Sequence, residues 1–224
     1  MSIIKILYST VLDALFPISK AEMEVLGMDG NKAFHTLPRA KKSPIREACS
    51  IFSYKDERVW RLIWGIKYKR SLIAARIAGF ALFQTLSMYV RAAFPVIIIP
   101  MPITAKRRRE RGFNQCELII DEIEKLAAKS DIADRLNFTR DLLLRSRHKS
   151  RQTLKDREER LESAHDIFEV SKNAVEKLKV LQNFPNHLLI VIDDVVTTGS
   201  TIREAVNTLR KAGFEKTFGL SVAH

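Results

Sequence analysis

The residues of this chain best suited to chemistry are two adjacent carboxylates and the small hydroxyl residues after them. Asp193 and Asp194 directly follow the apolar run 188–192. After two valines comes a turn of small residues, namely Thr197, Thr198, Gly199, Ser200 and Thr201. Carboxylates accept hydrogen bonds from the vicinal hydroxyls of a sugar, and a helix N-terminus with small residues binds phosphate. This order predicts a site for a phosphorylated pentose; the alternative is a strand end followed by a helix cap.

The elements that must position these residues are a strand before them and a helix after them. The β-branched run 188–192 predicts a strand buried on both faces of a parallel sheet. A helix is expected after the turn because apolar residues share one face, at Ile202, Ala205, Val206, Leu209 and Ala212. Gly213 suits the C-terminal cap of that helix.

A second segment suited to phosphate chemistry follows the proline-bounded apolar run 95–100. It reads KRRRERG from 106 to 112, with five basic residues and one acid before a glycine. Ligands of open parallel sheets bind beyond the carboxyl ends of the strands, and arginine pairs with phosphate oxygens through two parallel hydrogen bonds. We therefore expect a loop that binds pyrophosphate or a DNA backbone, through Lys106, Arg107, Arg108, Arg111 and Gly112. A solvated run of charge is the alternative.

The alternation of buried strands and helices predicts an α/β fold with a parallel sheet flanked by helices. Further strands are expected at 142–144, 167–170 and 216–223, and helices at 59–66, at 72–88 and up to about 128. The polar, basic segment 145–160 predicts an active-site flap or a disordered loop. Its site residues would be Arg147, Lys149, Arg151 and Gln152. The absence of G-x-G-x-x-G and G-x-x-x-x-G-K-[ST] argues against a dinucleotide site and against P-loop ATP hydrolysis.

Composition limits the class of protein. A chain of 224 residues with 46% hydrophobic residues suits one α/β domain or a domain with a small appendage. No apolar run reaches about 18 residues, so we expect no stable membrane insertion and interpret residues 1–17 as an amphipathic helix. Two cysteines, Cys49 and Cys116, are too few for a disulfide framework and favour a cytoplasmic location. The net charge of +12 indicates a polyanionic partner; a merely basic surface is the alternative.

Two motifs carry a resemblance to known families. The segment IVIDDVVTTGST at 190–201 resembles the 5-phosphoribosyl 1-pyrophosphate (PRPP) motif of type I phosphoribosyltransferases. That resemblance implies that Asp193 and Asp194 hold the ribose hydroxyls and that the turn 197–201 holds the 5-phosphate. The segment RGFNQ at 111–115 resembles the ComF family of competence proteins. Further matches to this family are I-P-M-P at 99–102, Tyr54, Leu62-Ile63, Lys67-Tyr68, Gln152, Arg160 and Phe168.

The resemblance covers about residues 51–224 and implies a phosphoribosyltransferase-like domain with a helical N-terminal hood. Residues 1–50 would be a helical and linker region, a degenerate counterpart of the zinc module with which ComF proteins commonly begin. That module has four cysteines, whereas this region has only Cys49, so no zinc is expected. The family also has Asn at the position of Ser163.

The function that this resemblance implies is binding of PRPP with magnesium by a phosphoribosyltransferase, a glycosyltransferase linked to DNA uptake in natural competence. Two alternatives remain open on the residues. One is a non-catalytic module that binds single-stranded DNA and contacts a competence helicase. The other is a sensor that binds PRPP without turnover.

Overall fold

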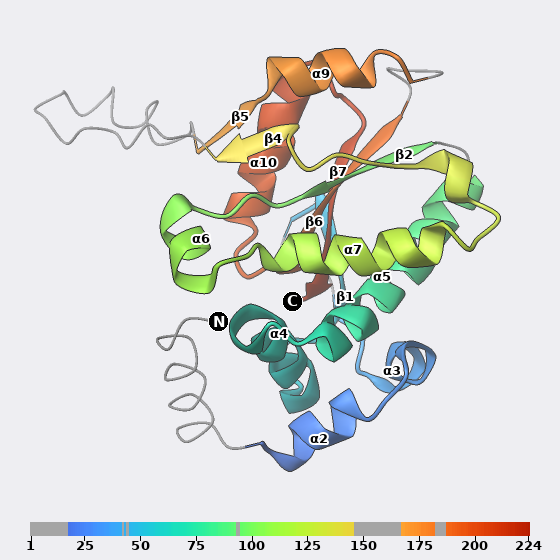
Figure 1. Cartoon of the computed structure of the whole chain (residues 1–224), viewed down its shortest axis with the longest axis vertical. Helices are drawn as coiled ribbons and strands as arrows, with labels where there is room; N and C mark the ends of the chain where they lie inside the picture. The colour runs from blue at the N-terminus through green and yellow to red at the C-terminus, as the bar shows by residue number, and fades with distance from the viewer. Residues whose placement is uncertain (1–17, 42, 44, 93–94, 146–166, 182–186) are drawn as a thin grey trace, which may run out of the picture.

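The computed structural model describes residues 18–41, 43, 45–92, 95–145, 167–181 and 187–224 (Figure 1). Its main sheet has five strands in the order β1-β7-β6-β2-β3, and every neighbouring pair is parallel. The strands are β1 (Ala48–Phe52), β2 (Val96–Pro100), β3 (Leu136–Phe138), β6 (Leu188–Val195) and β7 (Thr217–Ala223). The predicted α/β fold with a parallel sheet flanked by helices is confirmed.

The central strands β6 and β2 form where the sequence has its continuous apolar runs. All five residues of β2 are buried, as are residues 189–192 of β6, which is the pattern of strands covered on both faces. Their register pairs Val96 with Leu188 and Pro100 with Ile192. Because these parallel strands end side by side, the residues that follow Pro100 and Ile192 emerge at the same edge of the sheet.

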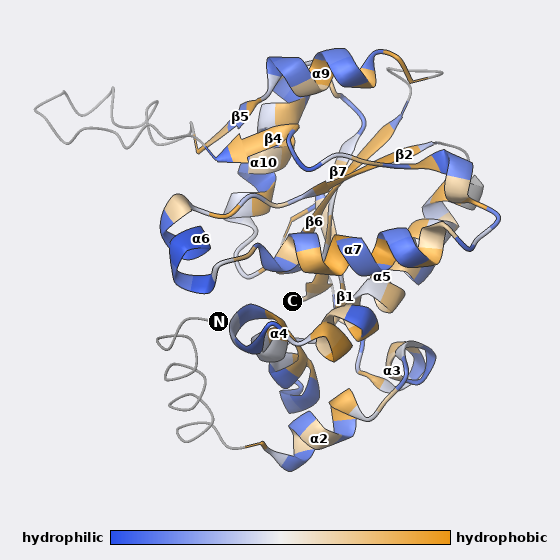
Figure 2. Cartoon of the chain, viewed as in Figure 1, coloured by the Kyte–Doolittle hydropathy of each residue, from blue (hydrophilic) through white to orange (hydrophobic). Residues whose placement is uncertain are grey.

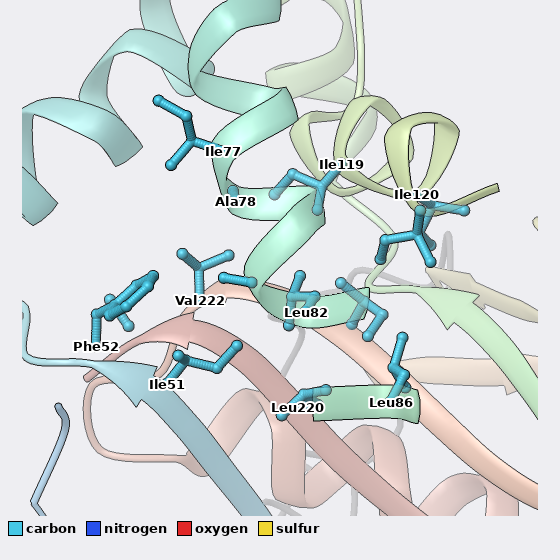
Figure 3. Close-up of a cluster of buried hydrophobic side chains, with 14 of the residues drawn as sticks. Ile51, Phe52, Ile77, Ala78, Leu82, Leu86, Ile119, Ile120, Leu220 and Val222 are labelled. Atoms are coloured by element: carbon cyan, nitrogen blue, oxygen red, sulfur yellow. The ribbon is translucent and has the colours of Figure 1, made fainter. Parts of the chain in front are cut away.

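Helices cover both faces of the sheet (Figure 1). On one face lie α5 (Leu72–Ala92) and α7 (Gln115–Ala127), and on the other lies α10 (Ser200–Lys211). Helix α9 (Lys172–Leu178) shares a buried cluster with α10. Figure 3 shows how residues of α5, such as Ile77 and Leu82, meet Phe52 of β1 and Val222 of β7. Each large aliphatic side chain buried in this way contributes roughly 1.5–3 kcal/mol to folding.

The N-terminal helices pack beside this core. Helix α2 (Lys20–Leu26) lies against α4 (Glu57–Lys69), and α3 (Gly30–Thr36) lies against α5. The buried carboxylate of Glu22 on α2 accepts from Lys69 Nζ of α4 at 3.3 Å. The strand β1 begins at Ala48 and therefore crosses the domain boundary expected after residue 50; the division into domains stays a prediction.

Two expected strands lie outside the main sheet. The segments expected at 142–144 and 167–170 form β4 (Leu143–Arg145) and β5 (Phe168–Val170), which pair antiparallel as a separate two-stranded sheet. The edge position of the main sheet is taken by β3, which the sequence did not indicate. Strands of three residues are too short to carry a periodicity, so the sequence could not show that these two strands pair with each other, apart from the main sheet.

Helix α5 also departs from expectation. Residues 72–90 are long and apolar enough to cross a membrane by length and composition, although no such run was expected. Half of this segment is buried inside the protein, where α5 contacts α3, α7 and the sheet. A helix that packs into a protein core can meet the same criteria of length and composition as a membrane span.

Candidate functional site

The acid pair lies at the carboxyl end of the central strand, in the wall of a cavity of about 320 Å³. Asp193 Oδ1 accepts from the Asp194 N–H at 2.9 Å and faces the thiol of Cys116, with Sγ at 3.7 Å. Asp194 is 3% exposed, and its Oδ1 accepts from the Val195 N–H at 2.7 Å. Lys67 Nζ lies 3.2 Å from the same oxygen. Asp194 Oδ2 has no hydrogen-bond partner in the part of the chain that the structure describes.

Burial and mutual repulsion govern the ionisation of this pair. The pKa of Asp193 rises to about 7, chiefly because its carboxylate is desolvated and then because Asp194 is charged. The Asp194 N–H and the Lys67 ammonium oppose this rise in the pKa of Asp193 but do not cancel it. Burial also raises the pKa of the Cys116 thiol well above its usual value, and the charge of Asp193 adds to that effect. Cys116 therefore stays a neutral donor to Asp193.

The hydroxyl turn opens helix α10 directly beside the acid pair. Gly199 is the N-cap with a φ of 79°, a left-handed conformation that glycine adopts without strain. Thr198 Oγ1 lies 3.1 Å from Ser200 Oγ and accepts from the Ser200 N–H at 3.4 Å, whereas Gly199 itself provides no side-chain cap. First-turn N–H groups of a helix that have no intrahelical acceptor can bind an anion. All five residues of the predicted phosphate site line the cavity.

The basic segment is a helix rather than the expected loop. Helix α6 (Ala105–Arg111) begins at Thr104, whose hydroxyl accepts from the Arg107 N–H at 3.2 Å, and ends at Gly112 with a φ of 79°. Lysine, arginine and glutamate are good helix formers, so a charge run between a threonine cap and a glycine folds locally into a helix. Figure 2 shows α6 as a strongly hydrophilic helix.

The helix separates the expected phosphate-binding residues into two groups. Arg107 and Arg111, one turn apart, line the cavity. Arg108 instead pairs with Glu117 at 2.8 Å, and Lys106 lies 3.8 Å from Glu110. Neither these two residues nor Gly112 lines the cavity.

The segment RGFNQ connects α6 to α7 and orients one of these arginines. Asn114 donates to the Met101 carbonyl at 3.1 Å and accepts from the Cys116 N–H at 3.0 Å, which joins the end of β2 to the start of α7. Gln115 Oε1 accepts from a terminal N–H of Arg111 at 3.0 Å. The Arg111 guanidinium also lies over the Tyr68 ring, 5.3 Å from its centroid.

Several residues that line the cavity had no role assigned from the sequence. They are Tyr54, Lys67, Tyr68, Gln115 and Arg145. Tyr54, Lys67-Tyr68 and Gln115 were matched to a family pattern, but the match gave them no role at the site. Lys67 and Tyr68 of α4 and Arg145 of β4 lie far from β6 in the chain, so only tertiary packing brings these side chains to the acids. Arg145 ends β4, where burial and the charge of Arg107 lower its pKa. The predicted flap residues Arg147, Lys149, Arg151 and Gln152 lie outside the described residues, as do Arg160 and Ser163.

The described residues contain no group of three or more His, Cys, Asp or Glu side chains that could hold a metal ion by themselves. The fold and the cleft define an α/β protein with a charged cavity at the carboxyl edge of a parallel sheet. No family model matches the chain.

Three proteins are similar to this chain. Competence protein F of Haemophilus influenzae is 34% identical over 125 residues, which are 54% of this chain and 47% of that protein. Competence protein ComFC of Bacillus subtilis is 30% identical over 117 residues, 52% of this chain and 39% of the relative. Competence protein ComFC of Streptococcus pneumoniae is 29% identical over 156 residues, 69% and 59% of the two chains. The chain is thus similar to competence proteins F and ComFC, and it spans about half the length of the relatives that it matches.

Proposed function

We propose that the cleft binds PRPP, or a related ribose phosphate, with magnesium, and that the chain acts in natural competence as a phosphoribosyltransferase of the ComF family. The observation that carries this proposal is that, in the described part of the chain, the acid pair, the start of α10 and three arginines line one cavity of about 320 Å³. A pocket of this size and polarity suits a small, multiply charged ligand.

Each part of the ligand has a matching part of the cleft. The 5-phosphate would accept hydrogen bonds from the hydroxyls and first-turn N–H groups of residues 197–201. The ribose diol would donate to Asp193 and Asp194. The pyrophosphate would lie toward Arg107, Arg111 and Arg145, which approach from α6 and β4.

The acid pair also fits a magnesium ion that arrives with the ligand. Magnesium prefers oxygen donors and is commonly held by one or two carboxylates together with substrate phosphates. Both acids line the cavity, and Asp194 Oδ2 is buried without a partner among the described residues, so Asp194, with Asp193 beside it, would hold the ion. When bound, magnesium would neutralise charge on the pyrophosphate.

The residues of the cleft would assist departure of the pyrophosphate mainly by position and charge. Loss of pyrophosphate from the anomeric carbon leaves positive charge on the sugar, which the neighbouring carboxylates stabilise. Arg107, Arg111 and Arg145 would stabilise the departing anion. Fixing the sugar at both its phosphate and its diol would orient the reacting carbon. The proposal assigns no general base.

Calorimetric titration with PRPP and magnesium tests the proposal. Wild type should bind, and Asp193→Asn/Asp194→Asn should weaken binding by at least about a hundredfold, because two hydrogen bonds to charged groups are lost. The exposed Glu215→Gln is a control that should bind as wild type does. Absence of heat with wild type, or unchanged affinity in the double variant, would contradict the proposal. Release of pyrophosphate with an acceptor would distinguish an enzyme from a PRPP sensor.

A second candidate is a module that binds single-stranded DNA and passes it to a competence helicase. The exposed cations of α6 beside the cleft favour it, since basic grooves follow nucleic-acid backbones. The two candidates differ in the sugar that the acids would recognise. Ribose 5-phosphate should bind more tightly than 2-deoxyribose 5-phosphate if the acids hold a diol, whereas equal affinity would favour DNA in the cleft.

A further inference from the structure

Lys67 reaches the acid pair from an element outside the strand–turn–helix motif. It lies in the last turn of α4, and its ammonium is 3.2 Å from Asp194 Oδ1. The side chain of Asp194 is 5% exposed and that of Lys67 is 20% exposed, so this ion pair is largely shielded from water. The charge of Lys67 also acts on Asp193 and on the hydroxyl of Tyr54.

The fold fixes the position of this ammonium. Leu62, Ile63 and Ile66 on the inner face of α4 are fully buried, which holds the helix against the core. Lys69, two residues further along, is paired with the buried Glu22. The backbone that carries Lys67 is therefore anchored on both sides, and the ammonium meets Asp194 without the freedom of a surface side chain.

We infer that Lys67 is the resident counter-ion of the acid pair and a positioning residue for Asp194. It engages Oδ1, whereas Oδ2 is buried without a partner among the described residues. With one positive charge already beside them, the two carboxylates attract a free divalent cation only weakly. The cleft therefore takes up its metal together with a diphosphate ligand rather than alone. This last consequence rests on the proposed function, whereas the counter-ion role does not.

Titration of the full chain with Mn²⁺, without any organic ligand, tests the counter-ion role. Free Mn²⁺ is followed by electron paramagnetic resonance. In Lys67→Met the acid pair loses its counter-ion, so Mn²⁺ should bind at least about tenfold more tightly than in wild type. Lys67→Arg keeps the charge and should remain near wild type. Lys129→Met removes an exposed lysine beyond the end of α7 and controls for the change in total charge.

A second set of variants keeps the test possible if Lys67→Met does not fold. Lys67→Met leaves a buried carboxylate without its cation, so its thermal melting is measured first. If it does not fold, Lys67→Gln, which can still donate to Asp194, is used for the same titration. The double variant Lys67→Met/Asp194→Asn removes both charges and should return Mn²⁺ affinity to that of wild type. A merely structural role for Lys67 would not produce this reversal.

The inference is overturned if the folded lysine variant binds Mn²⁺ as weakly as wild type, or if Lys129→Met increases the affinity equally. Neither result depends on PRPP. Failure of the proposed function would instead appear as absence of PRPP binding by wild type, whatever the Mn²⁺ titration gives.

Discussion

Asp193 lies where burial and the neighbouring Asp194 both disfavour a charged carboxylate. Its pKa of about 7 in the folded chain exceeds the value of about 3.9 expected in an unfolded chain. Between these values the folded state binds the additional proton, so the contribution of Asp193 to stability falls as pH rises from about 4 to about 7 and is then constant. The ionised carboxylate therefore destabilises the fold at neutral pH.

Asp193→Asn should remove this penalty because asparagine resembles the protonated acid. Its free energy of unfolding should exceed that of wild type by on the order of 1–2 kcal/mol at pH 8, and by little near pH 4. Urea denaturation at several pH values measures the difference. Asp141→Asn is the control, and it should lower the free energy of unfolding at neutral pH. Hydrogen bonds from Lys177 and Thr139 lower the pKa of Asp141, so its ionised carboxylate stabilises the fold. A pH-independent difference for Asp193→Asn would contradict the prediction.

Arg107 and Arg145 line the same cavity, and the charge of Arg107 lowers the pKa of Arg145. Two guanidinium groups that repel each other in this way suit a pyrophosphate between them. Arg107→Met and Arg145→Met should each lower PRPP affinity by about tenfold, as expected for loss of a charged hydrogen bond, and should change ribose 5-phosphate affinity little. Calorimetry with both ligands measures this split. Arg109→Met, on α6 but not in the cavity wall, is the control. Equal losses of affinity for both ligands would show that the arginines do not contact the pyrophosphate specifically.

At the scale of the element, the turn before α10 depends on a glycine at its last position. A Cβ at Gly199 would lie 2.8 Å from Ile45 Cγ2, and its φ of 79° is left-handed. Gly213, at the other end of α10, also has a positive φ of 95°, but a Cβ there would meet nothing within 4 Å. The two positions therefore separate the cost of backbone strain from the cost of steric overlap.

Gly213→Ala should cost only the strain, about 1 kcal/mol of unfolding free energy. Gly199→Ala should cost about 2–4 kcal/mol, because Ile45 must also move. Urea denaturation compares them, and ribose 5-phosphate affinity should fall in Gly199→Ala alone. Equal destabilisation by the two changes would show that Ile45 moves away from the new Cβ without loss of stability.

The same elements explain what the sequence could predict. The buried strands β2 and β6 were predictable because a run covered on both faces must be continuously apolar, and α10 because its apolar positions share one face. Helix α6 was wrongly expected to be a loop, since a short helix without a buried face carries no hydrophobic periodicity. Lys67 and Arg145 could not be placed at the acids, because no local pattern encodes a contact between α4, β4 and β6.

At the scale of the whole molecule, the cleft is assembled from four distant parts of the chain. The register between β2 and β6 brings the segment leading to α6 beside the acid pair, and α4 and β4 add Lys67 and Arg145. Among the described residues, four cationic side chains line the cleft together with the two carboxylates, in a chain with a net charge of +12. A cleft with excess positive charge attracts polyanions before any specific contact forms.

This charge distribution predicts that binding of a short single-stranded oligonucleotide depends steeply on salt. If four phosphates are contacted, affinity should fall about 50-fold between about 50 and 200 mM salt, from a slope of about −0.7 per phosphate on logarithmic axes. Fluorescence anisotropy measures the slope, and Arg107→Met should reduce its magnitude by about 0.7. PRPP with magnesium should displace the oligonucleotide if both occupy the cleft. An affinity independent of salt would contradict the electrostatic argument, whereas salt-dependent binding that PRPP leaves intact would place the nucleic acid on the outer face of α6.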